Sequence, residues 1–231
     1  MAYSLIAFDL DGTLINSEAR TIPNLIKVFN THYNLPITAE HFLNTYHGMA
    51  GPRLIDRINA DYSTQIIWEE FAPIRFAALE VDVREHGFEP APGMLQMLRR
   101  VVAEGQQICI VSNSNPKRIA LSLELTHGQR QHGLLLPALF EGHIISGTDP
   151  AEPSRQSKPA PDAYLAAAEY YRTTPETCLA IEDSATGVQA AVAAGFECWG
   201  YIGLNHAPNA AESLKAAGAS QIFTHWDAFK P

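Results

Sequence analysis

Short apolar runs alternate with helix-like stretches along most of the chain. Each run ends in small or polar residues, which is typical of buried strands. The apolar positions between the runs recur at helical spacing, and Gly105 and Gly195 follow two of these stretches as expected for helix ends. Strands are expected at residues 4–9, 106–115, 142–147, 178–184 and 197–203, and helices at residues 93–105, 116–128, 160–171, 185–195 and 211–217.

Residues 17–89 break this alternation. Their aromatic and aliphatic residues recur at helical spacing, as in "IPNLIKVFNTHY", and we expect several helices there without a strand. The first of these helices is expected to begin at Ile22, with Thr21 as its cap and Pro23 in its first turn. The sequence therefore predicts two domains: an α/β core of residues 1–16 and 90–231, and an inserted all-helical domain of residues 17–89.

Strands that alternate with helices favour a parallel, Rossmann-like sheet with helices on both faces. Ligands of such sheets bind beyond the carboxyl ends of the strands. Three predicted strands end in reactive side chains there: Asp9, then Ser112 with Asn113, then Glu182 with Asp183. Polar residues at the end of one strand could simply form a turn, but three such strand ends at one edge of the sheet indicate a ligand-binding or catalytic site.

The acidic residues at this edge need a counter-charge. Two carboxylates about 4 Å apart, as Asp9 and Asp11 could be, repel by about 4 kcal/mol at an effective dielectric constant of 20. Lys158 alone cannot neutralise four acids, whereas Mg²⁺ binds carboxylates, water and substrate phosphate together. One carboxylate beside such an ion can attack phosphorus, and a second can move protons. Asp9 and Asp11 suit these two tasks.

Four motifs resemble those of the haloacid dehalogenase (HAD) superfamily, in the branch of beta-phosphoglucomutase-like phosphatases with a helical cap. They occur in order as "FDLDGTL", "VSNS", "SKPAPDAY" and "IEDSATGVQAAVAAG", at residues 8–14, 111–114, 157–164 and 181–195. The resemblance thus covers nearly the whole chain and implies that residues 17–89 are the cap.

The resemblance also implies roles for the motif residues. Asp9 would be the nucleophile and a Mg²⁺ ligand, and Asp11 the general acid/base, with its backbone carbonyl on the metal. Ser112, Asn113 and Lys158 would bind the phosphate. Asp183 would complete the metal site, with Glu182 a ligand directly or through water. His47 and Arg53 lie where caps of this branch contact substrate.

Other branches of the superfamily fit the sequence less well. Dehalogenases lack an acid at the position of Asp11, and phosphonatases use a cap lysine, whereas the only lysine of this cap is Lys27. Sugar phosphomutases carry a cap histidine where this chain has Thr21, and an arginine where it has Gly51. We therefore expect a Mg²⁺-dependent hydrolase of a small phosphate monoester, such as a sugar or sugar-acid phosphate. A sugar phosphomutase and a catalytically silent phosphate-binding protein stay as alternatives.

The composition of the chain constrains its binding partners and its cellular compartment. The 231 residues are 46% hydrophobic and carry a net charge of −9, which disfavours non-specific binding to nucleic acid. The three cysteines have no metal-binding spacing and indicate a reducing compartment. Neither a signal peptide nor a membrane span is expected. We expect a cytoplasmic monomer that acts on a small phosphorylated metabolite.

Overall fold

The computed structural model describes residues 3–46, 49, 51–205, 207 and 209–231. The chain divides into two compact units, one of residues 1–16 and 88–231 and the other of residues 17–87. The second boundary lies two residues earlier than predicted, because the backbone of Phe88 hydrogen-bonds to Leu125 and that of Glu89 to Asn16. The division into a catalytic core and a substrate-selecting cap stays a prediction.

The first unit contains a six-stranded sheet in the order β3-β2-β1-β4-β5-β6, with every neighbouring pair parallel. The α/β fold expected from the sequence is thereby confirmed. The strands are β1 (Leu5–Phe8), β2 (Ile108–Ser112), β3 (Ile144–Ser146), β4 (Cys178–Glu182), β5 (Glu197–Tyr201) and β6 (Gln221–Phe223).

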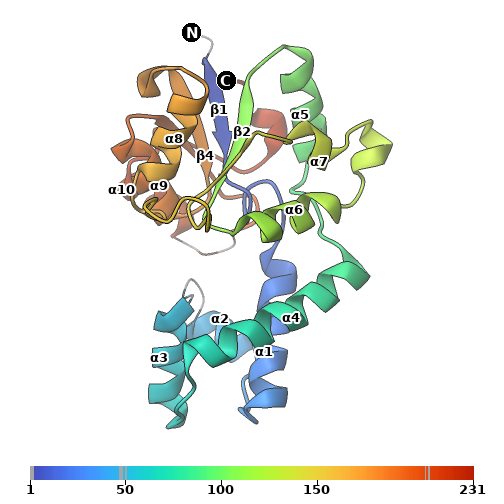
Figure 1. The fold of residues 1–231 in the computed structure, drawn as a ribbon, viewed down its shortest axis with the longest axis vertical. Helices are drawn as coiled ribbons and strands as arrows, with labels where there is room; N and C mark the ends of the chain where they lie inside the picture. The colour runs from blue at the N-terminus through green and yellow to red at the C-terminus, as the bar shows by residue number, and fades with distance from the viewer. Residues whose placement is uncertain (1–2, 47–48, 50, 206, 208) are drawn as a thin grey trace. The chain divides into compact units, whose positions relative to one another are not determined.

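Helices cover both faces of this sheet (Figure 1). In the first unit they are α5 (Met94–Ala103), α6 (Pro116–Glu124), α7 (Leu136–Leu139), α8 (Asp162–Tyr170), α9 (Ala185–Ala193) and α10 (Ala210–Ala217), with short 3₁₀ turns at Gln129–His132, Pro175–Thr177 and Trp226–Ala228. Helices α8, α9 and α10 lie on one side and α5 on the other. All four residues of β1 are buried, which explains its uninterrupted apolar run.

The described residues of the second unit form helices and the loops that connect them, without a strand. Its helices are α1 (Glu18–His32), α2 (Ala39–Thr45), α3 (Gly51–Tyr62) and α4 (Trp68–His86). Its core is a cluster of buried apolar residues in which Phe29 stacks on Phe71 with ring centroids 4.8 Å apart. The side-chain amides of Asn30 and Asn59 each form two hydrogen bonds with the backbone of a following loop, to the N–H and C=O of Ile37 and of Ile66 respectively.

Two elements differ from the sequence prediction. Helix α1 begins at Glu18 rather than Ile22, so Thr21 lies inside the helix and Pro23 beyond its first turn. Strand β6 was not expected, because three residues at the edge of a sheet are too few to show a strand pattern. Among the described residues, none of the helices is both long and apolar enough to cross a membrane.

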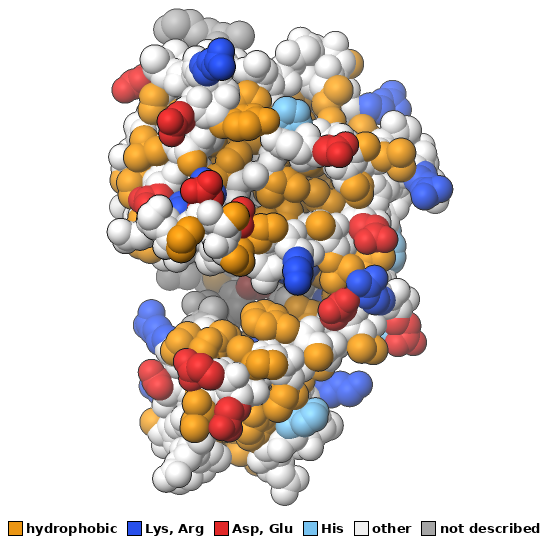
Figure 2. Space-filling model, viewed as in Figure 1, with side chains coloured by type: hydrophobic (Ala, Val, Ile, Leu, Met, Phe, Trp, Pro, Cys, Tyr) orange, Lys and Arg blue, Asp and Glu red, His pale blue; other side chains and the backbone are white. Residues whose placement is uncertain are grey.

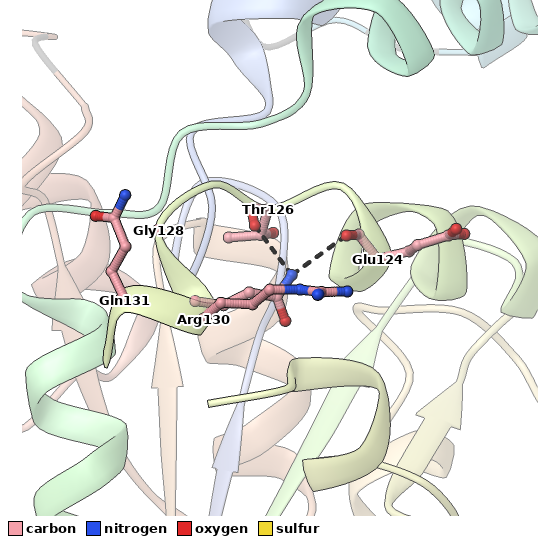
Figure 3. A pocket seen from close by; sticks show the side chains of 6 residues that line it. Glu124, Thr126, Gly128, Arg130 and Gln131 are labelled. Carbon is pink, nitrogen blue, oxygen red and sulfur yellow. Dashed lines mark hydrogen bonds between the residues drawn. The ribbon is translucent and has the colours of Figure 1, made fainter. Parts of the chain in front are cut away.

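A pocket of about 210 Å³ lies beside the loop that follows α6 (Figure 3). The buried Gln129 closes this loop: its Nε2 donates to the backbone oxygens of Leu123, Glu124 and Thr126, and its Oε1 accepts from the N–H of Leu136 at 2.7 Å. Since these contacts occupy the amide, we interpret Gln129 as a structural residue. None of the predicted site residues that the structure describes lines this pocket.

Gln129→Leu is therefore expected to lower the free energy of unfolding by about 2–4 kcal/mol, because it leaves buried backbone groups unpaired. Urea denaturation measures the change. Gln131→Leu is the matched control, since Gln131 is exposed two residues further on, and it should change stability by less than about 0.5 kcal/mol. Equal effects of the two substitutions would contradict this role.

Candidate active site

The central strand β1 lies between β2 and β4, and this arrangement builds the site. The three strands run in parallel, so their carboxyl ends bring Asp9, Ser112 and Glu182 to one edge. The N–H of Asp9 bonds to the oxygen of Ile181 at 2.9 Å, which continues the pairing of β1 with β4 beyond the end of the strand.

Three carboxylates gather at this edge. Asp9, Glu182 and Asp183 each offer a ligand oxygen, and these oxygens lie within 4.8 Å of one another. Asp9 and Glu182 are buried, whereas Asp183 is partly exposed. Clustered carboxylate oxygens suit a hard divalent cation, so the donor set fits the predicted metal site. The carboxylate of Asp11 is not part of this triad, and coordination of the metal by the backbone carbonyl of Asp11 stays a prediction.

Lys158 lies between two of these carboxylates. Its Nζ is 2.7 Å from Asp9 Oδ1, 2.5 Å from Glu182 Oε1 and 2.8 Å from the backbone oxygen of Val111. The lysine is buried, and its ammonium is held 5.2 Å from the centroid of the Tyr164 ring. Lys158 thus contacts two of the three carboxylates and supplies one positive charge, and a divalent cation would balance the remaining negative charge.

Burial also sets the protonation of the nucleophile candidate. Desolvation raises the pKa of Asp9 from 3.8 to about 8, and the charge of Glu182 adds to this, although the ammonium of Lys158 opposes it. For Lys158, burial by itself would lower the pKa, but Asp9 and Glu182 outweigh it and raise the pKa above its usual value. The lysine is therefore a permanent cation within the site.

Glu182 is fixed by its surroundings more firmly than the sequence indicates. The Tyr164 hydroxyl donates to its Oε1 at 2.7 Å, and the Ser184 hydroxyl donates to its Oε2 at 3.2 Å. A Cβ on Gly187 would lie 2.0 Å from this carboxylate, so the first turn of α9 approaches it as only glycine allows. These contacts orient Glu182 toward Lys158.

Asp11 follows β1 just before a sharp turn, and its carboxylate contacts the segment that enters α6 rather than the carboxylate triad. Its Oδ2 accepts a hydrogen bond of 2.7 Å from the Ser114 hydroxyl, and its Oδ1 lies 3.6 Å from Nη2 of Arg118. Gly12 makes the turn with φ +86°, and a Cβ there would strike Asp183 at 2.1 Å. We did not single out Arg118 from the sequence, since a lone cation on a helix gives no pattern to recognise.

Ser112 is the last residue of β2, which pairs with β1, and Asn113 follows it. Ser112 is buried, and its hydroxyl accepts from the N–H of Ser114 at 3.1 Å. The side chain of Asn113 forms two hydrogen bonds with the backbone of Lys158. Its Oδ1 accepts from the Lys158 N–H at 2.9 Å, and its Nδ2 donates to the Lys158 carbonyl oxygen at 3.2 Å. Asn113 thus positions the lysine, and phosphate binding by Ser112 and Asn113 stays a prediction.

The sequence predicted two residues of the helical unit, His47 and Arg53, as contacts for the substrate. His47 lies outside the described residues. Arg53 is an exposed residue in the first turn of α3, and its contact with a substrate stays a prediction. On the face of the molecule seen in Figure 2, Lys and Arg side chains are scattered among Asp and Glu rather than gathered in one patch.

The fold and the four motifs define a known family. The haloacid dehalogenase-like hydrolase profile matches residues 3–195. The chain belongs to this family, as its motifs predicted.

Curated relatives differ in how much of their length the chain matches. It is 27% identical over 229 residues to the probable pseudouridine-5'-phosphatase of Drosophila melanogaster, covering 97% of this chain and 90% of that protein. It is 28% identical to hexitol phosphatase A of Escherichia coli, with 81% and 78% covered. By contrast, 83% of the chain matches only 46% of the bifunctional riboflavin kinase/FMN phosphatase of Arabidopsis thaliana, at 24% identity.

The chain spans less than half the length of two other Arabidopsis thaliana relatives. It covers 17% of the protein SUPPRESSOR OF QUENCHING 1 and 34% of a haloacid dehalogenase-like hydrolase domain-containing protein.

Solved structures share the fold over nearly the whole chain. A haloacid dehalogenase-like protein from Agrobacterium tumefaciens superposes with a TM-score of 0.79 at 25% identity, covering 97% of this chain and 95% of its own. A HAD family hydrolase from Deinococcus radiodurans, solved with bound phosphate and sodium, gives a TM-score of 0.75 at 27% identity, with 97% and 92% covered.

Proposed function

We propose that the protein is a Mg²⁺-dependent phosphatase that hydrolyses a small phosphate monoester through an aspartyl-phosphate on Asp9. The observation that carries this proposal is the buried junction of Asp9, Lys158 and Glu182 next to the carboxylate of Asp183. The phosphatases among the relatives support it.

In this proposal Asp9 attacks phosphorus, and the bond from phosphorus to the ester oxygen breaks. Asp11 gives a proton to the departing oxygen and then takes one from the water that hydrolyses the acyl phosphate. Lys158 balances negative charge on the transferred group, and Ser112 donates hydrogen bonds to it.

Asp9 and Asp183, with Glu182 directly or through water, would hold the metal ion. The backbone carbonyl of Asp11 is a further predicted ligand. When bound, Mg²⁺ would supply a positive charge that draws the phosphate toward Asp9 and lowers the barrier to attack. The ammonium of Lys158 contacts Asp9 and Glu182. The ammonium and the metal ion would therefore balance the negative charge of the carboxylates together.

Turnover of p-nitrophenyl phosphate tests this function directly. Hydrolysis should require Mg²⁺, stop in EDTA and return when Mg²⁺ is added in excess. Inorganic phosphate and p-nitrophenol should appear in equal amounts. An absence of turnover, followed by none on a panel of phosphorylated metabolites, would favour a silent phosphate-binding protein. Conversion of hexose 1-phosphates to 6-phosphates without release of phosphate would favour a mutase.

Metal binding should depend on pH through Asp9. Between about pH 4 and pH 8 the unfolded chain has lost the Asp9 proton while the metal-free folded chain keeps it, because the folded pKa is about 8. The unfolded state binds fewer protons, so the contribution of Asp9 to the free energy of unfolding falls as pH rises through this range. Mg²⁺ must displace the same proton, and its Kd should rise about tenfold per pH unit below pH 8.

Differential scanning fluorimetry checks this expectation. Mg²⁺ should raise the thermal midpoint more at pH 8 than at pH 5. Asp9→Asn has no proton to lose and should flatten this dependence. An equal shift at both pH values in the wild type would show that Asp9 does not control the site.

A further inference from the structure

We infer that Arg118 is a positioning residue for Asp11, which it holds at the start of α6 so that the acid/base carboxylate faces the bond that breaks. This inference rests on the proposed function. It concerns a side chain outside the four motifs to which we assigned the chemistry.

The contacts of Asp11 carry the inference. One carboxylate oxygen accepts from the Ser114 hydroxyl at 2.7 Å, and the other lies 3.6 Å from Arg118 Nη2. Both partners belong to the segment that leaves β2 and enters α6. The carboxylate is therefore held from the β2 side, whereas the metal-binding carboxylates Asp9, Glu182 and Asp183 form a separate group.

Arg118 is itself held in place. Its guanidinium lies 4.6 Å from the centroid of the Phe88 ring, and its Nη1 donates to the Ser122 hydroxyl. Its backbone N–H bonds to the side chain of Asn115, the residue that caps α6, at 3.0 Å. The arginine side chain is only 14% exposed, so it has a fixed place rather than a mobile surface position.

A fixed cation beside a carboxylate restricts where that carboxylate can point. Proton transfer to a leaving group needs the donor within hydrogen-bond reach of the ester oxygen. The transfer matters most when the departing alcohol is a poor leaving group, and little when it is p-nitrophenolate. Loss of Arg118 should therefore harm the two kinds of ester unequally.

The experiment compares p-nitrophenyl phosphate with an alkyl phosphate such as glycerol phosphate, in Mg²⁺, for the full chain. Arg118→Gln should lower kcat on the alkyl ester about 10- to 100-fold and on p-nitrophenyl phosphate less than about threefold, with little change in KM. Arg118→Lys, which keeps the charge, should restore part of the loss. Lys117→Gln removes an exposed cation from the same turn and should leave both rates unchanged.

A double-mutant cycle separates positioning from general stabilisation. In an Asp11→Asn background, Arg118→Gln should have no further effect on the alkyl ester. An equal loss on both esters, or a full further loss in that background, would overturn the inference while the proposed function stands. A wild type that hydrolyses neither ester, or an Asp9→Asn variant that still hydrolyses both, would instead overturn the proposed function.

Discussion

Asp9→Asn is expected to lower kcat for phosphate ester hydrolysis by at least about 10³-fold, because an amide oxygen cannot form the acyl phosphate. The substitution keeps the size of the side chain. It also removes a carboxylate that burial disfavours in its charged form. The metal-free variant should therefore be at least as stable as the wild type near pH 8, so lost activity would not reflect unfolding.

Steady-state assays of the purified variant, with thermal unfolding in EDTA, measure both effects. Asp227→Asn is a suitable control, since the Asp227 side chain is 79% exposed, and it should retain full activity. An Asp9→Asn variant with more than about a tenth of wild-type kcat would disprove nucleophilic attack by Asp9.

Lys158→Met has the second large effect, on both stability and activity. The thioether fills the same space but leaves Asp9 and Glu182 buried without their cation. Removing one partner of a buried ion pair costs about 3–5 kcal/mol. Because Lys158 lowers the pKa of Asp9, its loss raises that pKa further, and the destabilisation should be greater at pH 8 than at pH 5.

Urea denaturation of the metal-free variant at the two pH values measures this change. Exposed Lys117→Met is the control and should change the free energy of unfolding by less than about 0.5 kcal/mol. Hydrolysis by Lys158→Met should also fall, even where Mg²⁺ restores part of the stability. A variant as stable as the wild type at pH 8 would show that the buried carboxylates do not need this cation.

The sequence predicted those parts of the site that depend on strand ends. Parallel strands have few ways to pair, so apolar runs that end in Asp9, Ser112 and Glu182 specify a shared edge once the fold class is known. A division into two units could also be foreseen to within two residues, because the helical spacing of residues 17–89 differs clearly from the pattern of the rest of the chain. The family followed from four motifs, three of which lie at the ends of β1, β2 and β4.

The orientation of side chains could not be predicted in the same way. The hydrogen bonds of the Asn113 amide with the N–H and C=O of Lys158 are one example, because the sequence gives no sign that these two residues meet. Contacts such as that of Arg118 with Asp11 depend on where α6 starts and how it packs on Phe88. Such details follow from tertiary packing, which no local pattern encodes.

The central position of β1 also has a consequence for how the protein acquires its structure. Ile6 pairs with Ile108 on one side and with Leu179 on the other, so β1 is synthesised well before both of the strands that flank it. The helical segment, whose contacts are local, can form in the meantime. We expect nascent chains that lack β4 to expose the edge of β1 that β4 would cover, which chaperones can bind.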